Sequence, residues 1–238
     1  MYKIRTLIPL LATILLIGCA QVTITGSGEV VTQEEAISEF DKVDISQSFN
    51  VEIKQGESFS VLIRVDDNLV EHLNVVKQGS TLRIGLDPNR SYTIRNATME
   101  AEVTMPELLG LDLSGNSDAN VSGFESTKSL VVDLSGNSGL LGDIQAGDAR
   151  FDVSGNSSVT VTGSAGSVSV DASGSSEVDL TDFPASDGTV NASGASTVIV
   201  NLSGRLDADA SGSSDVYYLG EPTLGQMDTS GSSSIKPK

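Results

Sequence analysis

An acidic or amide side chain recurs two residues before each of a series of Ser-Gly pairs in the second half of the chain. This column comprises Asp112, Asp133, Asp152, Asp171, Asn191, Asp209 and Asp228. If the segments that carry these residues stack in register, neighbouring carboxylates lie ~5 Å apart, the spacing of adjacent β-strands. Like charges at this distance repel each other, so some other group must relieve the repulsion.

Two kinds of group could relieve the column. Turn N–H groups or neighbouring serine hydroxyls could donate hydrogen bonds to each Asp, as Asp side chains often accept them beside turns. Alternatively, Ca²⁺ could bind there, because it takes several oxygen ligands. The position just before a Ser-Gly turn favours turn capping. The spacing matches neither the calcium-binding nonapeptide nor an EF-hand loop, so we assign no metal ligands.

Serine forms two further columns at the same turns, and these could contact a glycan or protein partner. We expect instead that they form polar ladders that stabilise the corners, because few aromatic residues are available to stack on sugar rings. The first column comprises Ser114, Ser135, Ser154, Ser173, Ser193, Ser211 and Ser230. The second lies three residues further on in each turn.

No residue pattern indicates catalysis, and we assign no catalytic residue. His72 is the only histidine and has no recognisable nucleophile motif near it. Zinc is not expected, because the chain has a single histidine and a single cysteine. Residues 111–238 contain only five basic side chains, too few for the clustered cations of a polysaccharide lyase.

The charge balance restricts the partners. Lys and Arg number 14 against 32 Asp and Glu, which gives a net charge of −18. This balance argues against binding to nucleic acid, because such binding depends on cations that neutralise phosphates. It is compatible with divalent cations or with a basic partner.

The only cysteine, Cys19, follows a segment typical of an exported lipoprotein. Residues 1–18 read as a signal peptide, with a basic start at Lys3 and Arg5 and a short apolar stretch. Leu16 to Cys19 (Leu-Ile-Gly-Cys) resembles the bacterial lipobox. That resemblance implies acylation at Cys19 and anchoring to a membrane outside the cytoplasm. Ala20 after the cysteine favours the outer membrane.

The Ser-Gly turns mark a sequence repeat, and their glycines are 18 to 21 residues apart. A unit of about 19 residues rich in Val, Ser, Thr and Gly is too short for two packed helices and disfavours helix. It fits one coil of a parallel β-solenoid, with aliphatic residues on both sides of each Asp pointing inward. We therefore expect an all-β fold with a narrow core that leaves little room for aromatic rings.

The chain before the repeats is less regular. Residues 19–40 read as the lipidated cysteine and a tether, in which Val22 and Ile24 could form a short strand. Residues 41–110 show alternating β patterns. They either continue the solenoid of residues 111–234 or form a second, less regular β unit packed on it, and we favour the second unit. Residues 43–48 resemble a faint extra copy of the repeat that lacks the glycine.

Repeated Asp-x-Ser-Gly-(Asn/Ser/Ala)-Ser units behind a lipobox resemble the auto-transporter adhesin head domain family, also called the GIN domain. The resemblance covers roughly residues 40–234. It implies a β-helix-like solenoid, common in lipoproteins and secreted proteins of the Bacteroidetes group, and it brings no catalytic residues with it. The Gly-Ile-Asn motif of the family name is not present as such; Ser-Gly-Asn-Ser and Ser-Gly-Ser-Ser occupy comparable turns.

Two non-enzymatic functions follow from these features. The first is a cell-envelope adhesin or binding module that displays one solenoid face to a glycan or a protein. The second is a periplasmic structural or envelope-maintenance lipoprotein, with or without a Ca²⁺-stabilised Asp column. In either case, unpaired end coils favour association between copies, so a homo-oligomer is compatible with the sequence.

Overall fold

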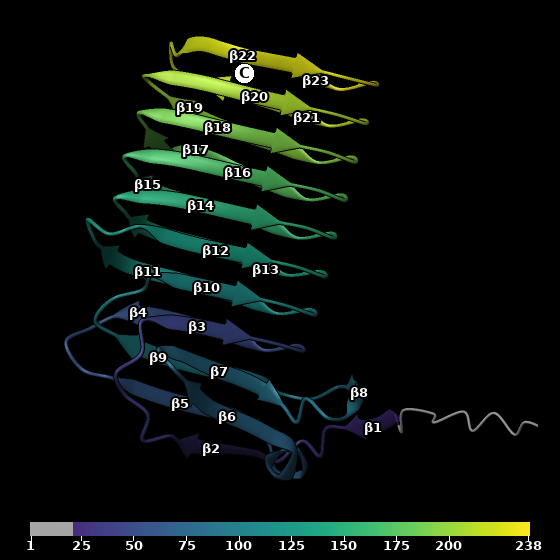
Figure 1. Cartoon of the computed structure of the whole chain (residues 1–238). Helices are drawn as coiled ribbons and strands as arrows, with labels where there is room; N and C mark the ends of the chain where they lie inside the picture. The colour runs from purple at the N-terminus through teal and green to yellow at the C-terminus, as the bar shows by residue number, and fades with distance from the viewer. Residues whose placement is uncertain (1–20) are drawn as a thin grey trace, which may run out of the picture.

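The computed structural model describes residues 21–238, and these form two facing sheets of stacked strands (Figure 1). One sheet has ten strands, in the spatial order β22 (Thr223–Thr229), β20 (Arg205–Ala210), β18 (Asp187–Ala192), β16 (Ser167–Ala172), β14 (Asp148–Val153), β12 (Leu130–Leu134), β10 (Gly110–Leu113), β3 (Lys42–Ile45), β7 (Thr81–Leu86) and β6 (Leu73–Gln78).

The second sheet has eleven strands. Their spatial order is β2 (Val30–Glu34), β5 (Ser60–Asp66), β9 (Met99–Met105), β4 (Asn50–Gln55), β11 (Asp118–Glu125), β13 (Gly139–Gln145), β15 (Ser158–Ser164), β17 (Glu177–Ala185), β19 (Thr197–Leu202), β21 (Asp215–Leu219) and β23 (Ser234–Pro237). A small third sheet pairs β1 (Gln21–Thr25) with β8 (Ser91–Arg95), and a 3₁₀ helix, η1, spans Asp67–His72.

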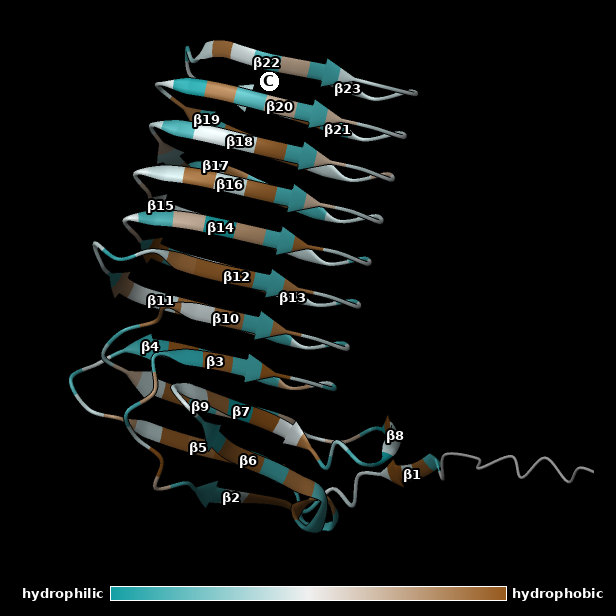
Figure 2. Cartoon of the chain, viewed as in Figure 1, coloured by the Kyte–Doolittle hydropathy of each residue, from teal (hydrophilic) through white to brown (hydrophobic). Residues whose placement is uncertain are grey.

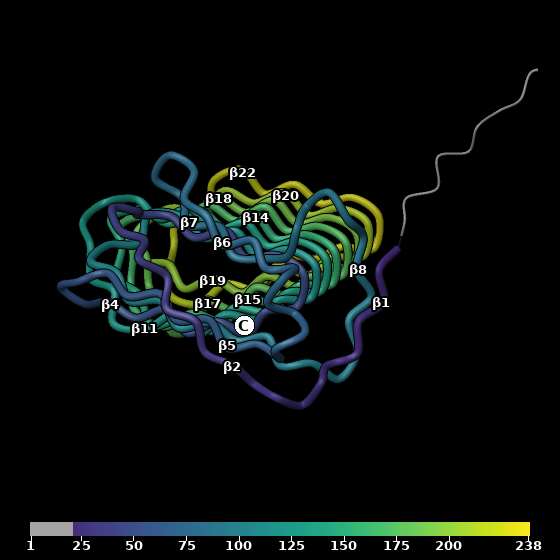
Figure 3. The backbone as a smooth tube through the Cα atoms, turned by 90° about the horizontal axis from the view of Figure 1, so that it is seen from below, coloured from purple at the N-terminus to yellow at the C-terminus, as the bar shows by residue number. Residues whose placement is uncertain are grey.

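From β10 onward the chain forms a solenoid of stacked coils, and each coil adds one strand to each sheet. All of these pairings are parallel, and the repeats stay in register: Asp112 pairs with Asp133, and Asp133 with Asp152. Seen along the stack, successive coils lie over one another (Figure 3). The expected all-β solenoid, in which each repeat forms one coil, is therefore confirmed.

Glycine occupies the Ser-Gly corner of every coil from β10 onward, where the turn and the stacking both require it. Gly174 adopts φ +78°, a left-handed conformation that favours glycine. A Cβ at this position would overlap the carbonyl oxygen of Gly155 in the coil below. That oxygen cannot move away, because it accepts a hydrogen bond of 2.7 Å from the backbone N–H of Ser175. The same stacked contact recurs at the glycines of the other repeats.

The extra copy of the repeat at residues 43–48 is part of the solenoid. β3 pairs in parallel with β10 so that Asp44 lies beside Asp112. Gln47 occupies the corner position with φ 69°. As the first residue of the corner column it meets no earlier corner carbonyl, and its side-chain oxygen accepts a hydrogen bond from the Leu86 N–H at 2.9 Å. A residue with a side chain is therefore tolerated at this one corner.

The expectation of a separate β unit over residues 41–110 is wrong. Strands β3, β7 and β6 extend the ten-stranded sheet, and β4, β9 and β5 extend the other. The chain completes the β3/β4 coil, turns back through β5 and β6, and then passes over that coil to begin β10. Alternating apolar residues give the strands, but the order in which strands stack depends on long-range pairing.

The chain is also folded within the segment that reads as a tether. β1 pairs in parallel with β8, and β2 pairs antiparallel with β5. Ile24 and Phe40 are buried in the common core. The short strand suggested by Val22 and Ile24 is present and spans Gln21–Thr25. The signal peptide of residues 1–18 and Cys19 lie outside the described residues.

Aliphatic side chains from both sheets fill the space between them, and apolar and polar residues alternate along the strands (Figure 2). The prediction that aromatic rings would find little room is wrong. Phe49, Phe151 and Phe183 are almost completely buried, and the last two meet edge to face at 6.1 Å between ring centroids. Sheets that face each other at ~10 Å leave enough depth for a ring. No helix among residues 21–238 is long and apolar enough to span a membrane.

Replacing Gly174 by Ala tests the corner contact. The left-handed conformation should cost about 1 kcal/mol, and overlap with the Gly155 carbonyl should add ~1–3 kcal/mol. Urea unfolding followed by circular dichroism measures the loss. Gly123→Ala is the matched control, because Gly123 also has φ +78° but has no atom within 4 Å of the added methyl group. Equal losses for the two variants would show that the stacked carbonyl imposes no constraint.

Candidate functional site

The Asp column lies on the outer face of the ten-stranded sheet. The pairing places Asp112, Asp133, Asp152, Asp171, Asn191, Asp209 and Asp228 side by side on successive strands, and Asp44 precedes them. The side chains point away from the core because their neighbours on each strand point inward. The predicted in-register stacking is therefore observed.

Two arginines and the amide of Asn191 relieve much of the repulsion in this column. Arg150 donates to Asp152 at 2.8 Å and to Asp171 at 2.7 Å, so one guanidinium bridges two coils. Arg83 lies 2.8 Å from Asp44. Asn191 donates from Nδ2 to Asp171 at 2.7 Å. None of the column residues accepts a hydrogen bond from a Ser-Gly turn, so the expected turn capping by Asp is wrong.

Serines cap the turns instead. In six of the seven repeats the hydroxyl of the second serine donates to the backbone carbonyl of the first, as Ser176 does to Ser173 at 3.0 Å. In the remaining repeat Ser157 Oγ accepts a hydrogen bond of 3.2 Å from the Ser138 N–H. Ser176 also lies 3.3 Å from the Val153 carbonyl of the coil below and is buried. The expected polar ladder at the corners is thus formed by buried hydroxyls that are satisfied within the fold. Buried and satisfied groups of this kind are not free to bind a ligand.

Asp112 and Asp133 have no cation in ion-pair contact within the described residues. Burial raises the pKa of Asp112, and the neighbouring carboxylates Asp44 and Asp133 raise it further, while Arg83 opposes them. Burial likewise raises the pKa of Asp133, with Asp152 adding to the effect. These two residues line a shallow depression of about 350 Å³ with Asp152 and Asp171.

The described residues contain no group of three or more His, Cys, Asp or Glu side chains arranged to hold a metal ion. The carboxylates lie in a line along the sheet, one on each strand, and do not converge on a point. Ca²⁺ requires several converging oxygen ligands. The geometry therefore favours relief by arginine and amide groups.

His72 lies at the end of η1, and its side chain is mostly covered. Its ring meets Tyr92 edge to face at 5.5 Å, and its Nε2 lies 3.7 Å from Glu71. Among the described residues, no serine or cysteine forms a hydrogen bond with the ring. The surroundings of His72 are thus those of a packing residue.

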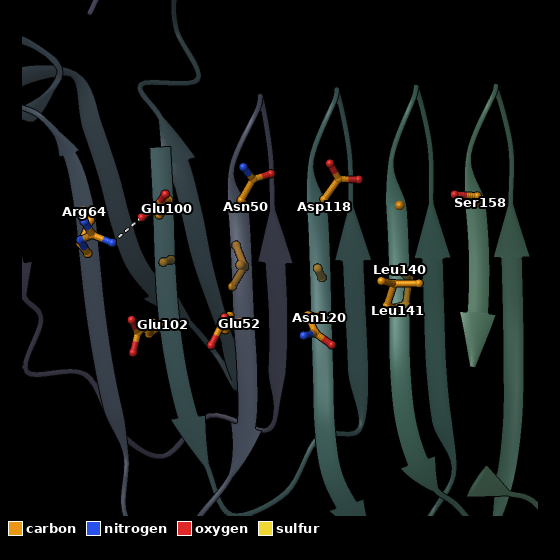
Figure 4. Close-up of a pocket in the computed structure, with 14 residues that line it drawn as sticks. Asn50, Glu52, Arg64, Glu100, Glu102, Asp118, Asn120, Leu140, Leu141 and Ser158 are labelled. Atoms are coloured by element: carbon orange, nitrogen blue, oxygen red, sulfur yellow. Dashed lines mark hydrogen bonds and ion pairs between the residues drawn. The ribbon is translucent and has the colours of Figure 1, made fainter. Parts of the chain in front are cut away.

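A groove of about 690 Å³ lies on the outer face of the eleven-stranded sheet. Its lining comes from β5, β9, β4, β11, β13 and β15, whose outward side chains lie in rows across the sheet (Figure 4). The Asp118 carboxylate lies where a Cβ of Gly139 would be. Leu141 lies in the groove with 59% of its surface exposed.

The groove is acidic. Glu52, Glu100, Glu102 and Asp118 line it against a single cation, Arg64, which donates to Glu100 at 2.6 Å. Just outside, Lys54 donates to Glu52 at 2.5 Å. Neither Glu102 nor Asp118 has an ion-pair partner within the described residues. Free carboxylates in a groove that also contains an exposed leucine suit a basic group that carries an alkyl chain, such as Lys or Arg.

The sequence did not single out these groove residues. They occupy outward positions of ordinary alternating strands, and their only shared signal is polarity at every second position. β9 and β4 become neighbours only because the chain passes back over an earlier coil. The residues that the sequence did single out, the Asp column, lie on the opposite sheet.

The sequence of this chain matches a known protein family. Residues 39–222 match a family described as "Putative auto-transporter adhesin, head GIN domain". The chain belongs to this family. No match is found among curated proteins. Membership confirms the resemblance drawn from the repeats, and it indicates a protein of the cell envelope or surface.

Solved structures show the same head GIN fold. A putative adhesin from Bacteroides fragilis is 23% identical, with a TM-score of 0.80, and the match covers 90% of this chain and 100% of that one. A putative adhesin from Parabacteroides distasonis is 16% identical, with a TM-score of 0.65 and coverage of 90% and 100%. A putative lipid binding protein from Parabacteroides distasonis is 24% identical, with a TM-score of 0.63 and coverage of 91% and 100%. At these levels of sequence identity, the similarity shows a shared fold and nothing more.

Asp133→Asn tests the electrostatics of the Asp column in this head GIN domain. A carboxyl whose pKa is raised on folding destabilises the fold as pH rises above its ordinary value of 3.8. We therefore expect Asp133→Asn to stabilise the protein at pH 7 by about 0.5 kcal/mol, because solvent screens exposed charges. The gain should vanish below about pH 4, where both states bind the proton.

Thermal unfolding at pH 4 and pH 7 measures this gain. Asp171→Asn is the control and should destabilise at pH 7, because Asp171 accepts from both Arg150 and Asn191. If Asp133→Asn lowers the melting temperature at pH 7 and chelation of divalent cations lowers that of the wild type, a bound cation stabilises the column instead.

Proposed function

We propose that this chain is a non-enzymatic, lipid-anchored adhesin of the cell envelope that binds a protein partner in the groove of the eleven-stranded sheet. The observation that carries the proposal is the groove itself, a concave face of carboxylates with an exposed leucine. Membership of the adhesin family supports the adhesive role. The proposal places the acyl anchor at Cys19 and the protein at the outer membrane.

The lining of the groove favours a protein over a glycan. Sugar rings commonly stack on aromatic side chains, and the groove has none. Glu102 and Asp118 offer unpaired carboxylates, and Leu141 offers apolar contact on the strand beyond Asp118. A protein surface with Lys or Arg side chains complements both, because the alkyl stem packs on leucine while the charge meets a carboxylate.

The proposed anchor also has a geometric consequence. Cys19 would be separated from β1 by Ala20 alone, so the lipid would join the folded domain almost directly. β1 lies at the end of the molecule opposite β22 (Figure 1). The solenoid would then stand with its N-terminal end at the membrane, and the groove, formed by the coils nearest that end, would lie on its side.

Proteolysis of intact cells tests the location. A surface adhesin should lose its solenoid when an externally added protease of broad specificity is used at a concentration that degrades a known surface protein. A periplasmic protein of the same cells serves as the control for membrane integrity. Complete protection of this chain, together with the control, would favour the periplasmic structural role.

Binding of an oligolysine peptide tests the groove. Fluorescence anisotropy at low ionic strength should show binding that weakens as salt screens the charges. Replacing Glu102 and Asp118 by Gln and Asn should weaken binding about two- to five-fold per charge, since exposed ion pairs contribute ~0.2–1 kcal/mol. The matched control is Asp209→Asn with Asp228→Asn, which removes the same charge from the opposite sheet.

Equal losses for the two double variants would show that oligolysine responds only to net charge, which would contradict a role for the groove. Binding of a neutral oligosaccharide that depends on Glu102 and Asp118 would show that the partner is a glycan.

A further inference from the structure

The two ends of the solenoid differ in whether other elements cover the hydrophobic core. At the N-terminal end, η1 and the antiparallel strands cover the core, so that Val65 and Leu69 are completely buried. The edge strands there, β6 and β2, carry the charged residues Lys77 and Glu34, which protect an edge from pairing. Within the described residues, no element covers the C-terminal coil, β22 and β23.

The inward positions of this last coil are exposed to solvent. Leu224 lies in register with Leu206, which is completely buried in the coil below, yet Leu224 is 48% exposed. Ile235 lies above the fully buried Val216 and is only partly buried. Met227 is likewise only partly buried, above the buried Ala208. The end of the solenoid is thus an open cross-section of the hydrophobic core.

The same coil leaves both sheets with a free strand edge. The outer edge of β22 has no neighbour among the described strands, so its outward N–H and C=O groups lack strand partners. Pro237 has no N–H to offer from β23, and we therefore expect β22 to provide most of any pairing. A surface that presents two strand edges across an apolar interior is matched by another surface of the same construction.

Charge favours a second copy of this chain as the occupant. The whole chain carries a net charge of −18, which makes most of its surface repel another copy. Residues 221–238 are balanced, because Glu221 and Asp228 are offset by Lys236 and Lys238. The last coil is therefore a part of the molecule where two copies can approach without strong repulsion.

We propose that two copies associate end to end through this C-terminal coil. A two-fold axis perpendicular to the solenoid axis places β22 antiparallel to its symmetry mate and extends the ten-stranded sheet across the contact. The N-terminal end is covered and cannot form a second contact of this kind. The assembly therefore stops at two copies, because a filament needs two open ends. Leu224 and Met227 of both copies then close the apolar cross-section.

The contact is small. Strands β22 and β23 contribute 7 and 4 residues from each copy, fewer than the ~20–30 residues a side of a standard interface. We therefore expect a dissociation constant on the order of 10 µM.

One consequence rests on the lipid anchor of the proposed function. Copies joined at their C-terminal coils carry their N-terminal ends, and hence Cys19, at opposite ends of the dimer. Each solenoid spans about 43 Å from β6 to β22, taken as nine strand spacings of ~4.8 Å. Such a dimer joins two facing membranes, and this contact then adds a second copy of the chain to the basic partner proposed for the groove.

Sedimentation equilibrium of the soluble chain from Gln21 tests the contact without the anchor. This chain contains every described strand and the whole hydrophobic core. The wild type should pass from monomer to dimer as its concentration rises through the micromolar range. Leu224→Lys should weaken dimerisation at least ~10-fold, because symmetry brings the new charge into the contact twice.

Leu141→Lys is the matched control, because it makes the same change at the exposed leucine of the groove. It should leave the dimer intact. A wild type that stays monomeric at about 500 µM, well above the expected constant, would overturn the proposal. So would a dimer equally stable in both variants, or one lost only in Leu141→Lys.

Hydrogen exchange of the wild type covers the case in which Leu224→Lys disorders its own coil. The amides of β22 should exchange more slowly as concentration rises, while those of β11 and β13 should not change. Concentration-independent exchange at β22 would overturn the contact. With acylated protein on phosphatidylcholine vesicles, clustering that disappears in Leu224→Lys supports bridging. Absence of clustering by a protein that still dimerises would contradict the anchor geometry alone.

Discussion

The contact between a corner glycine and the carbonyl of the glycine below determines how the coils stack. The carbonyl of Gly155 accepts the N–H of Ser175 and lies where a Cβ of Gly174 would be. A coil can therefore approach the coil below to strand-pairing distance at this corner only if its own corner residue lacks a side chain; Gln47, the first in the column, has no corner carbonyl below it. Parallel register along both sheets follows, because the corners align each coil with the one before it. The aligned polar columns are a consequence of this register.

Alignment gives the two outer faces different chemistry. On the ten-stranded sheet, Arg150 bridges Asp152 and Asp171, and Asn191 replaces a carboxylate. Much of the charge on that face is thus satisfied within the fold. On the eleven-stranded sheet, Glu102 and Asp118 lack ion-pair partners among the described residues, and Leu141 is exposed in the same groove. Unpaired carboxylates in a concave site can form ion pairs with a partner. The groove is therefore the better candidate for binding one.

The two ends of the solenoid also differ, because the core is covered at the N-terminal end and exposed at the C-terminal end. Turning the chain back through β5 and β6 places antiparallel strands and η1 over one end of the core, and Leu69 is buried there. At the other end Leu224 occupies an inward position without a covering layer. A molecule with a groove on its side and one open end has two separate surfaces for association. The groove suits a basic protein, and the open end suits another copy of itself.

The sequence by itself determined the all-β solenoid, the inward and outward sides of each repeat and the register of the Asp column. Period-two alternation and a glycine every 18 to 21 residues are local signals, and stacking identical units in register is their only compact outcome. Family membership could also be inferred from the turns. Tertiary structure alone decided that residues 41–110 complete both sheets, that arginines and an amide pair with the Asp column in place of turn groups, and that β9, β4 and β11 together form a groove. These features depend on which strands become neighbours, and pairing between distant segments leaves no periodic trace in the sequence.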